Sequence, residues 1–217
     1  MKKFKLTSEF IVDISGVKLF RIKALIEFGN VKAGDLGGYI EKEENLSHMG
    51  NAWVSGDTRI SGDAQVSGDA RVFGDARVSG NAWVSGDTRV SGDTRISGDA
   101  QVSGNARVSG NARVFGDAWV FGDARVSGNA RVSGDAQVSG DARVSGDKDY
   151  AYAHGFGSCN RTTTFFRLKD GDVGVRCGCF YGTLAQFRDK VCETHGETKK
   201  AQEYLMLADL MEIRFKN

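Results

Sequence analysis

The sequence predicts a mainly β protein whose centre is a parallel β-helix, a coil of about five turns with a triangular cross-section. From residue 51 to residue 146 a six-residue unit repeats sixteen times without an insertion, and we call this stretch the repeat segment. A period of six with a β-branched residue at a constant place fits a short strand followed by a corner. The chain also has 29 glycines and no proline, which indicates many tight turns at regular positions.

Each unit has the same order of side chains. Position one is Asp or Asn, position two Ala or Thr, position four Val or Ile, and position six Gly, as in the unit DAQVSG of residues 63–68. Positions two and four point the same way because side chains alternate along a strand. The Gly of one unit and the Asp or Asn of the next tolerate the positive φ values of a sharp corner. Three units therefore close one coil of 18 residues.

Stacking every third unit sorts the outward residues in position three onto three faces. The first arginine face carries Trp53, Arg71, Arg89, Arg107, Arg125 and Arg143. The second arginine face carries Arg59, Arg77, Arg95, Arg113 and Arg131. The third, which we call the neutral face, carries Gln65, Trp83, Gln101, Trp119 and Gln137.

The charges of the chain are nearly balanced. There are 29 basic and 28 acidic residues, so no overall field favours nucleic acid or an anionic membrane. The repeat segment contains ten arginines and eleven aspartates, which indicates a solvated, charge-balanced surface. Binding of nucleic acid or a nucleotide by the arginine faces is the less favoured alternative, because the aspartate columns would repel a polyanion.

The neutral face is the predicted binding surface. Trp83 and Trp119 lie two coils apart on it, with Gln101 between them, and Phe121 and Phe115 add apolar side chains beside Trp119. Exposed aromatic patches usually mark partner surfaces, so we expect this one to bind a protein partner or a second copy of the chain. Packing of each tryptophan on the neighbouring glutamine stems remains the alternative.

The ends of the chain predict caps. Residues 1–39 read as an N-terminal β cap, with a hairpin formed by two apolar runs around the pair Ser15-Gly16. The β-helix is predicted over residues 40–150, because Ile40 and Leu46 are six apart and Leu46 lies six before Ala52.

Residues 151–217 are predicted to form a linker and a small α+β module. DYAYAHGFGS indicates an imperfect half-coil or linker, and TTTFFRLKDGDVGVRCGCF predicts two strands around the pair Asp170-Gly171. Thr183 can cap a helix that reaches His195, and a second helix is predicted over residues 199–213.

The repeat resembles the hexapeptide-repeat family, in which an aliphatic residue is followed four positions later by a small one, as Val54 is by Thr58. Members of that family wind left-handed, so the resemblance implies a left-handed parallel β-helix. The segments KAGDLGGYIEKEENLS, CGCFYGT and KVCETHG are similar to uncharacterised bacterial and phage or prophage proteins labelled transferase-like or polymer-forming. This likeness implies a fold and a frequent viral or prophage origin, but no established reaction.

Catalysis is not expected. Acyltransferases of the hexapeptide-repeat family usually place a catalytic histidine near a loop that leaves the coil, between subunits. In this chain His48, His154 and His195 all lie outside the repeat segment, and no loop interrupts it. We therefore predict no catalytic residue, and a divergent acyltransferase is the alternative.

A zinc site is the one cofactor hypothesis. Cys177, Cys179, Cys192 and His195 form a C-x-C pair and a C-x-x-H group, a spacing that zinc ligands can have. The same thiols could equally be small core residues. No other cofactor is predicted.

The expected function is a non-enzymatic scaffold or binding protein in the bacterial cytoplasm, without a membrane segment, since no apolar run approaches the roughly 18 residues of a membrane span. The alternative is a phage-encoded inhibitor that captures a host factor or a small nucleotide.

Overall fold

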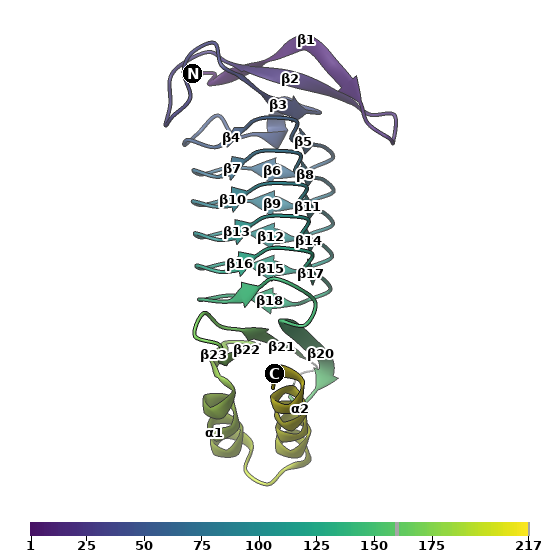
Figure 1. Cartoon of the computed structure of the whole chain (residues 1–217), viewed down its shortest axis with the longest axis vertical. Helices are drawn as coiled ribbons and strands as arrows, with labels where there is room; N and C mark the ends of the chain where they lie inside the picture. The colour runs from purple at the N-terminus through teal and green to yellow at the C-terminus, as the bar shows by residue number, and fades with distance from the viewer. Residues whose placement is uncertain (159–160, 217) are drawn as a thin grey trace.

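The computed structural model describes residues 1–158 and 161–216 (Figure 1). Small strands stack in a column, with an antiparallel layer across the N-terminal end and a sheet with two helices at the other end (Figure 1). This is the predicted mainly β architecture, with a β-helix between two caps.

The N-terminal cap is the predicted hairpin and one further strand. β1 (Phe4–Val12) pairs antiparallel with β2 (Lys18–Ala24), and β2 pairs antiparallel with β3 (Leu36–Ile40). β3 then pairs in parallel with the first strand of the second arginine face, so one continuous sheet joins the cap to the coil. A 3-10 turn, η1 (Glu43–Asn45), follows β3.

The repeat segment forms three parallel sheets of two-residue strands. The first arginine face consists of β4 (Trp53–Val54), β7 (Arg71–Val72), β10 (Arg89–Val90), β13 (Arg107–Val108), β16 (Arg125–Val126) and β19 (Arg143–Val144). The second arginine face consists of β5 (Arg59–Ile60), β8 (Arg77–Val78), β11 (Arg95–Ile96), β14 (Arg113–Val114) and β17 (Arg131–Val132). The neutral face consists of β6 (Gln65–Val66), β9 (Trp83–Val84), β12 (Gln101–Val102), β15 (Trp119–Val120) and β18 (Gln137–Val138).

The predicted sorting of residues by face is confirmed, but the coil is longer than predicted. Arg71 pairs with Arg89 and Trp83 with Gln101, as stacking of every third unit requires. The first arginine face has the six stacked strands that the sixteen units supply, and each of the other two faces gains one rung from before the repeat segment. These rungs arise because β3 and the bridge between Leu46 and Val66 begin a coil before the repeat segment starts.

This first coil has two additional residues. Ile40 pairs with Ile60 and Leu46 with Val66, a separation of 20 residues, whereas Trp53 pairs with Arg71, a separation of 18. Leu46 therefore stacks on Val66, a valine in position four. Counting six residues back from Ala52 predicts position two for Leu46, and that prediction is wrong. The extra length lies just after Leu46, where the ring of His48 stacks on Phe4 of the cap at 4.3 Å.

The interior of the coil is a column of small and β-branched side chains. Every Ala, Val and Ile in positions two and four is buried, which removes their apolar surface from water. The threonines in position two are buried as well, and the hydroxyl of Thr94, for example, donates to the carbonyl of Ser91 at 2.6 Å. Their polar atoms are thus satisfied inside the core.

Glycine in position six is required by both conformation and packing. Gly86 has φ +70°, and a Cβ placed on it would lie 2.8 Å from the carbonyl oxygen of Gly104 in the next coil. A side chain would therefore be strained and would also separate the stacked corners.

Polar side chains close the N-terminal edge of the coil. Backbone N–H groups of each coil donate to carbonyls of the next, as Trp53 does to Ala70, so the first coil is left with unpaired carbonyls. The Lys3 ammonium donates to the carbonyl oxygens of Ala52 (2.8 Å) and Gly50 (3.3 Å). The Asn45 amide donates to those of Gly62 and Ala64, both at 2.9 Å.

The C-terminal edge has the opposite requirement, because the last coil leaves N–H groups unpaired. The Asp147 carboxylate accepts from Arg131 N–H (3.1 Å), and the Asp149 carboxylate from Ser145 N–H (2.8 Å). The hydroxyl of Thr164 accepts from the N–H of Gln137 at 2.9 Å. Donors therefore cap one end of the coil and acceptors the other.

The C-terminal module is an antiparallel sheet covered by two helices. The sheet has the order β20 (Tyr150–Phe156), β21 (Arg161–Arg167), β22 (Val173–Cys177) and β23 (Phe180–Thr183). The prediction of a half-coil or linker at DYAYAHGFGS is wrong, because β20 pairs with β21 from Tyr150 onward. Neighbouring residues of β21 face opposite ways: Phe166 belongs to the core of the coil and Phe165 to a second core under the helices.

Both predicted helices are present. α1 (Leu184–His195) begins at Thr183, whose hydroxyl accepts from the N–H of Gln186, and Gly196 ends it. α2 (Lys199–Phe215) buries Tyr204, Ala208 and Met211 against α1 and the sheet. Neither of these helices is long and apolar enough to cross a membrane.

Candidate binding surfaces on the coil

The neutral face presents two half-exposed tryptophans. Trp83 is 50% exposed and Trp119 43%, and Gln101 on β12 separates them in the sheet. Strands stack about 4.8 Å apart, so the backbone positions of the two tryptophans are roughly 10 Å apart in the same sheet. The indole N–H of Trp83 donates to the hydroxyl of Ser67 at 3.3 Å. The structure thus places Trp83, Gln101 and Trp119 together, as the sequence predicts.

The predicted cluster of Trp119, Phe121 and Phe115 needs a correction. The rings of Trp119 and Phe121 contact each other edge to face, 6.5 Å between centroids. Phe121 is partly buried, because the guanidinium of Arg176 from β22 lies 5.4 Å from its ring centroid. Phe115 is exposed at a neighbouring corner, and no aromatic contact joins it to Phe121 or Trp119 among the described residues. Phe121 thus contacts the C-terminal module as well as Trp119.

A hollow of about 470 Å³ lies at the N-terminal end of the neutral face, beside Trp83. Gln65 and Ser67 from the coil line it, together with Leu46 and the carboxylates Glu43 and Glu44. Lys2 forms an ion pair of 2.7 Å with Glu43 and lowers the pKa of that carboxyl. Apolar, amide and acidic groups therefore surround Trp83.

The edge of the neutral face is acidic. The position-one residues of its units are exposed, and they are Asp63, Asn81, Asp99, Asp117 and Asp135. Lys42 forms an ion pair of 2.5 Å with Asp63 and lowers the pKa of that carboxyl. With position three uncharged, the surface around the tryptophans carries negative charge at its margin.

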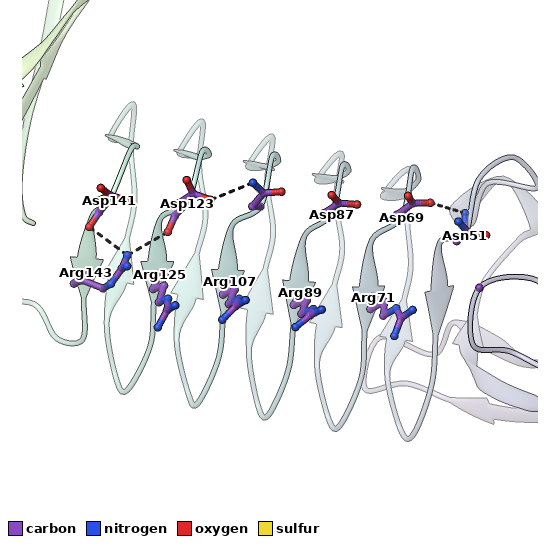
Figure 2. Close-up of a pocket in the computed structure, with 12 residues that line it drawn as sticks. Asn51, Asp69, Arg71, Asp87, Arg89, Arg107, Asp123, Arg125, Asp141 and Arg143 are labelled. Atoms are coloured by element: carbon purple, nitrogen blue, oxygen red, sulfur yellow. Dashed lines mark hydrogen bonds between the residues drawn. The ribbon is translucent and has the colours of Figure 1, made fainter. Parts of the chain in front are cut away.

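The first arginine face contains a groove of about 610 Å³. In Figure 2 the side chains of Arg71, Arg89, Arg107 and Arg125 form one row, and the carboxylates beside them form a second row parallel to it. Among the described residues, no arginine of the repeat segment lies within 4.0 Å of a carboxylate oxygen. The two rows are thus at least partly exposed and opposite in charge, without direct ion pairs.

The histidines stay outside the coil, but one reaches its surface. Nδ1 of His154 lies 2.9 Å from the hydroxyl of Thr162 and 3.6 Å from the carboxylate of Asp135 in the repeat segment. His48 is held between Phe4 and Glu43 at the N-terminal cap, and the ring of His195 stacks on Tyr204 in the C-terminal module. The three rings therefore lie in three different places.

The four residues of the zinc hypothesis do not converge. Cys177, Cys179 and His195 line a hollow of about 190 Å³ beside Tyr204, but Cys192 is exposed and does not line it. Val191 is buried against the module, so the next residue of α1 points about 100° away. Within residues 1–158 and 161–216, no group of three or more His, Cys, Asp or Glu side chains is placed to hold a metal ion.

Two exposed apolar features were not predicted. Phe73, in position five on the first arginine face, is 42% exposed. Met206, Leu210 and Ile213 form an exposed stripe on α2. Their spacing of four and three residues could have indicated the stripe, but the buried face of the same helix has a similar apolar pattern.

Comparison with known proteins supports the repeat architecture. The repeat segment matches the family model of the YdcK beta solenoid repeat at residues 64–80, 76–92, 100–111, 106–122, 124–137 and 136–147. No curated protein sequence matches the chain. The chain is a β-helix repeat protein whose central segment is similar to the YdcK beta solenoid repeat.

Proposed function

We propose that the protein is a non-enzymatic binding scaffold that holds a protein partner on its neutral face. The observation that carries the proposal is the pair of half-exposed tryptophans, Trp83 and Trp119, on the face without charge in position three. Tryptophan supplies a large apolar area and is enriched among residues that dominate binding energy. A rigid coil loses little conformational entropy on binding, which favours affinity.

The chemistry of the face favours a partner with an apolar centre and basic surroundings. Asp99, Asp117 and Asp135 are exposed beside the tryptophans, so lysine or arginine at the edge of the partner would meet opposite charge. Capture of a host factor by a viral inhibitor would use the same surface. A second copy of the chain is the alternative partner, because its arginines lie on every rung, so every second one has the spacing of Trp83 and Trp119.

We propose no catalytic role for the coil. A general base is needed for acyl transfer, and histidine is the usual one. The repeat segment contains no histidine, and His154, which lies against Asp135, is on the outer surface of β20. Binding of a protein partner without catalysis requires only the neutral face with Trp83 and Trp119.

The test uses the full chain with a photo-crosslinking residue at position 101, between the tryptophans. Immobilised protein is exposed to a bacterial lysate, and crosslinked proteins are identified by mass spectrometry. The double variant Trp83→Ser/Trp119→Ser should lose the crosslinked partner. The matched control is Phe73→Ser, which removes an aromatic side chain of similar exposure from the first arginine face and should retain it.

The outcomes are distinct. Equal crosslinking by wild type and the double variant would contradict the proposal, as would equal loss in the Phe73→Ser control. Light-scattering mass measurement of the same proteins separates the two kinds of partner. If wild type is oligomeric and only the double variant is monomeric, the neutral face binds a second copy and not another protein.

A further inference from the structure

We infer that the second arginine face holds a small phosphorylated ligand, in a hollow beneath the tip of the N-terminal hairpin. The hollow has a volume of about 240 Å³ and lies where the turn between β1 and β2 approaches the coil. Three consecutive rungs each contribute an arginine and a serine to its lining, namely Arg59, Arg77, Arg95, Ser61, Ser79 and Ser97. This site is separate from the neutral face and does not depend on the function proposed for it.

The three guanidiniums are available to a ligand. None of Arg59, Arg77 and Arg95 lies within 4.0 Å of a carboxylate oxygen in the part of the chain that the structure describes. Stacked rungs bring their positive charges about 4.8 Å apart, where they repel by roughly 1 kcal/mol per pair in water. An anion between them would relieve this repulsion and accept two parallel hydrogen bonds from an arginine fork.

The aspartate column lies on the other side of these arginines. The hollow is lined by residues in positions three to five, and the position-one carboxylates Asp57, Asp75 and Asp93 do not line it. The groove of the first arginine face differs, because Asp69 and Asp87 line it together with their arginines. Repulsion by aspartates, which argues against anion binding in that groove, is therefore weaker here.

The hairpin supplies the remaining walls. Asp13 is the one carboxylate that lines the hollow among the described residues, and its Oδ1 accepts hydrogen bonds from Ser15 N–H (2.8 Å) and Val17 N–H (2.9 Å). That oxygen is therefore held within its own turn. Ile14 and Leu19 add apolar surface to the same hollow.

Charge and volume select the class of ligand. Three arginines against one aspartate leave two positive charges, which a phosphate dianion or a diphosphate would balance. Drug-sized pockets start at about 300 Å³, so a ligand here is small, or only its anionic head enters. Serine hydroxyls in each rung can donate to the further phosphate oxygens. We therefore favour a diphosphate group, free or at the end of a metabolite.

The probe is inorganic pyrophosphate, titrated into the full chain by calorimetry at low salt. We expect Arg77→Gln, the central rung, to weaken binding at least tenfold. Arg89→Gln is the matched control, because it removes an exposed arginine from the first arginine face and should change affinity less than twofold. Ser79→Phe should also abolish binding by filling the hollow, and Phe73 and Phe115 show that position five of the coil accepts phenylalanine.

Three results would overturn the inference: no measurable binding at millimolar pyrophosphate, equal weakening by Arg77→Gln and Arg89→Gln, or unchanged binding by Ser79→Phe. Equal weakening would mean that the arginine columns attract anions only through their general charge. Circular dichroism of each variant establishes that the coil is folded before the titration is interpreted.

Discussion

The ammonium group of Lys3 donates a hydrogen bond of 2.8 Å to the carbonyl oxygen of Ala52, 49 residues along the chain. Lys3 is only 2% exposed, and its ammonium also lies 4.6 Å from the centroid of the Phe28 ring. A lysine is rarely buried so fully unless it is paired. No coil precedes the first one to donate N–H groups to its carbonyls. The Lys3 ammonium donates to the carbonyl oxygens of Ala52 and Gly50 instead.

Replacing this donor should destabilise the whole coil. In Lys3→Met the carbonyls of Ala52 and Gly50 lose their buried partner, so we expect the free energy of unfolding to fall by about 2 kcal/mol. Urea denaturation followed by circular dichroism measures it. The control is Lys2→Met, which breaks an exposed ion pair with Glu43 and should cost less than about 1 kcal/mol. An equal loss of unfolding free energy in both variants would contradict the capping role of Lys3.

The same lysine should make stability depend on alkaline pH. Burial lowers the pKa of Lys3 from 10.5 to about 8, and the charge of Asp69 opposes the shift only partly. Between pH 8 and 10.5 the unfolded chain then binds more protons than the folded one, so stability increases with pH in this window. The shift corresponds to roughly 3 kcal/mol at most.

Comparison with Lys3→Met isolates this contribution from other groups that titrate at high pH. The difference in unfolding free energy between wild type and Lys3→Met should grow from pH 8 to pH 10.5. A constant difference across that range would mean that Lys3 has an ordinary pKa.

The corner glycines should be sensitive to substitution for two reasons that can be separated. Gly86→Ala places a Cβ at positive φ and 2.8 Å from the carbonyl oxygen of Gly104, so we expect a loss of about 3 kcal/mol or more. Gly16 in the hairpin turn also has positive φ (+81°), but a Cβ there meets nothing within 4 Å. Gly16→Ala should cost only about 1 kcal/mol. Similar losses would show that stacking of corners adds nothing to the conformational strain.

The tryptophans of the neutral face should matter little for stability. Trp83 and Trp119 are half exposed, and other side chains form the buried interior of the coil. The double variant Trp83→Ser/Trp119→Ser should therefore lower the free energy of unfolding by less than about 1 kcal/mol. Thermal or urea denaturation of the double variant checks this. A loss of several kcal/mol would instead favour the interpretation that these rings stabilise the stack by packing on the glutamine stems.

The cysteines should behave as separate thiols. Cys192 is exposed, whereas Cys177 is half-buried and its thiol contacts the hydroxyls of Thr163 and Tyr204. A maleimide should therefore label Cys192 at least several times faster than Cys177, with peptide mass spectrometry as the readout. Added zinc should not change these rates. Joint protection of Cys177, Cys179 and Cys192 by zinc would support the metal site that the sequence spacing suggests.

Periodicity made much of the coil predictable. Position four is Val or Ile in every unit, and one coil has 18 residues. The neighbours of Val84 in the stack are therefore the residues 18 positions before and after it, Val66 and Val102. The same counting placed Trp83, Gln101 and Trp119 on one face. Local signals sufficed for the helices as well, because the capping hydroxyl of Thr183 and the terminal glycine Gly196 act within one turn of α1. The hand of the coil remains a prediction from resemblance, because a period has no hand.

The sequence by itself determined the elements that repeat or that close on near neighbours, because their contacts lie at a constant, short separation. Only the tertiary structure decided how the coil ends and what covers its faces. Lys3 reaches Ala52, Thr164 reaches Gln137, and the hairpin tip at Asp13 reaches the rungs of Arg59 and Arg77, all without a period that could be read in advance. The first two of these contacts exist because an open edge of a sheet must pair its N–H and carbonyl groups, and the chain meets that need with residues distant in sequence.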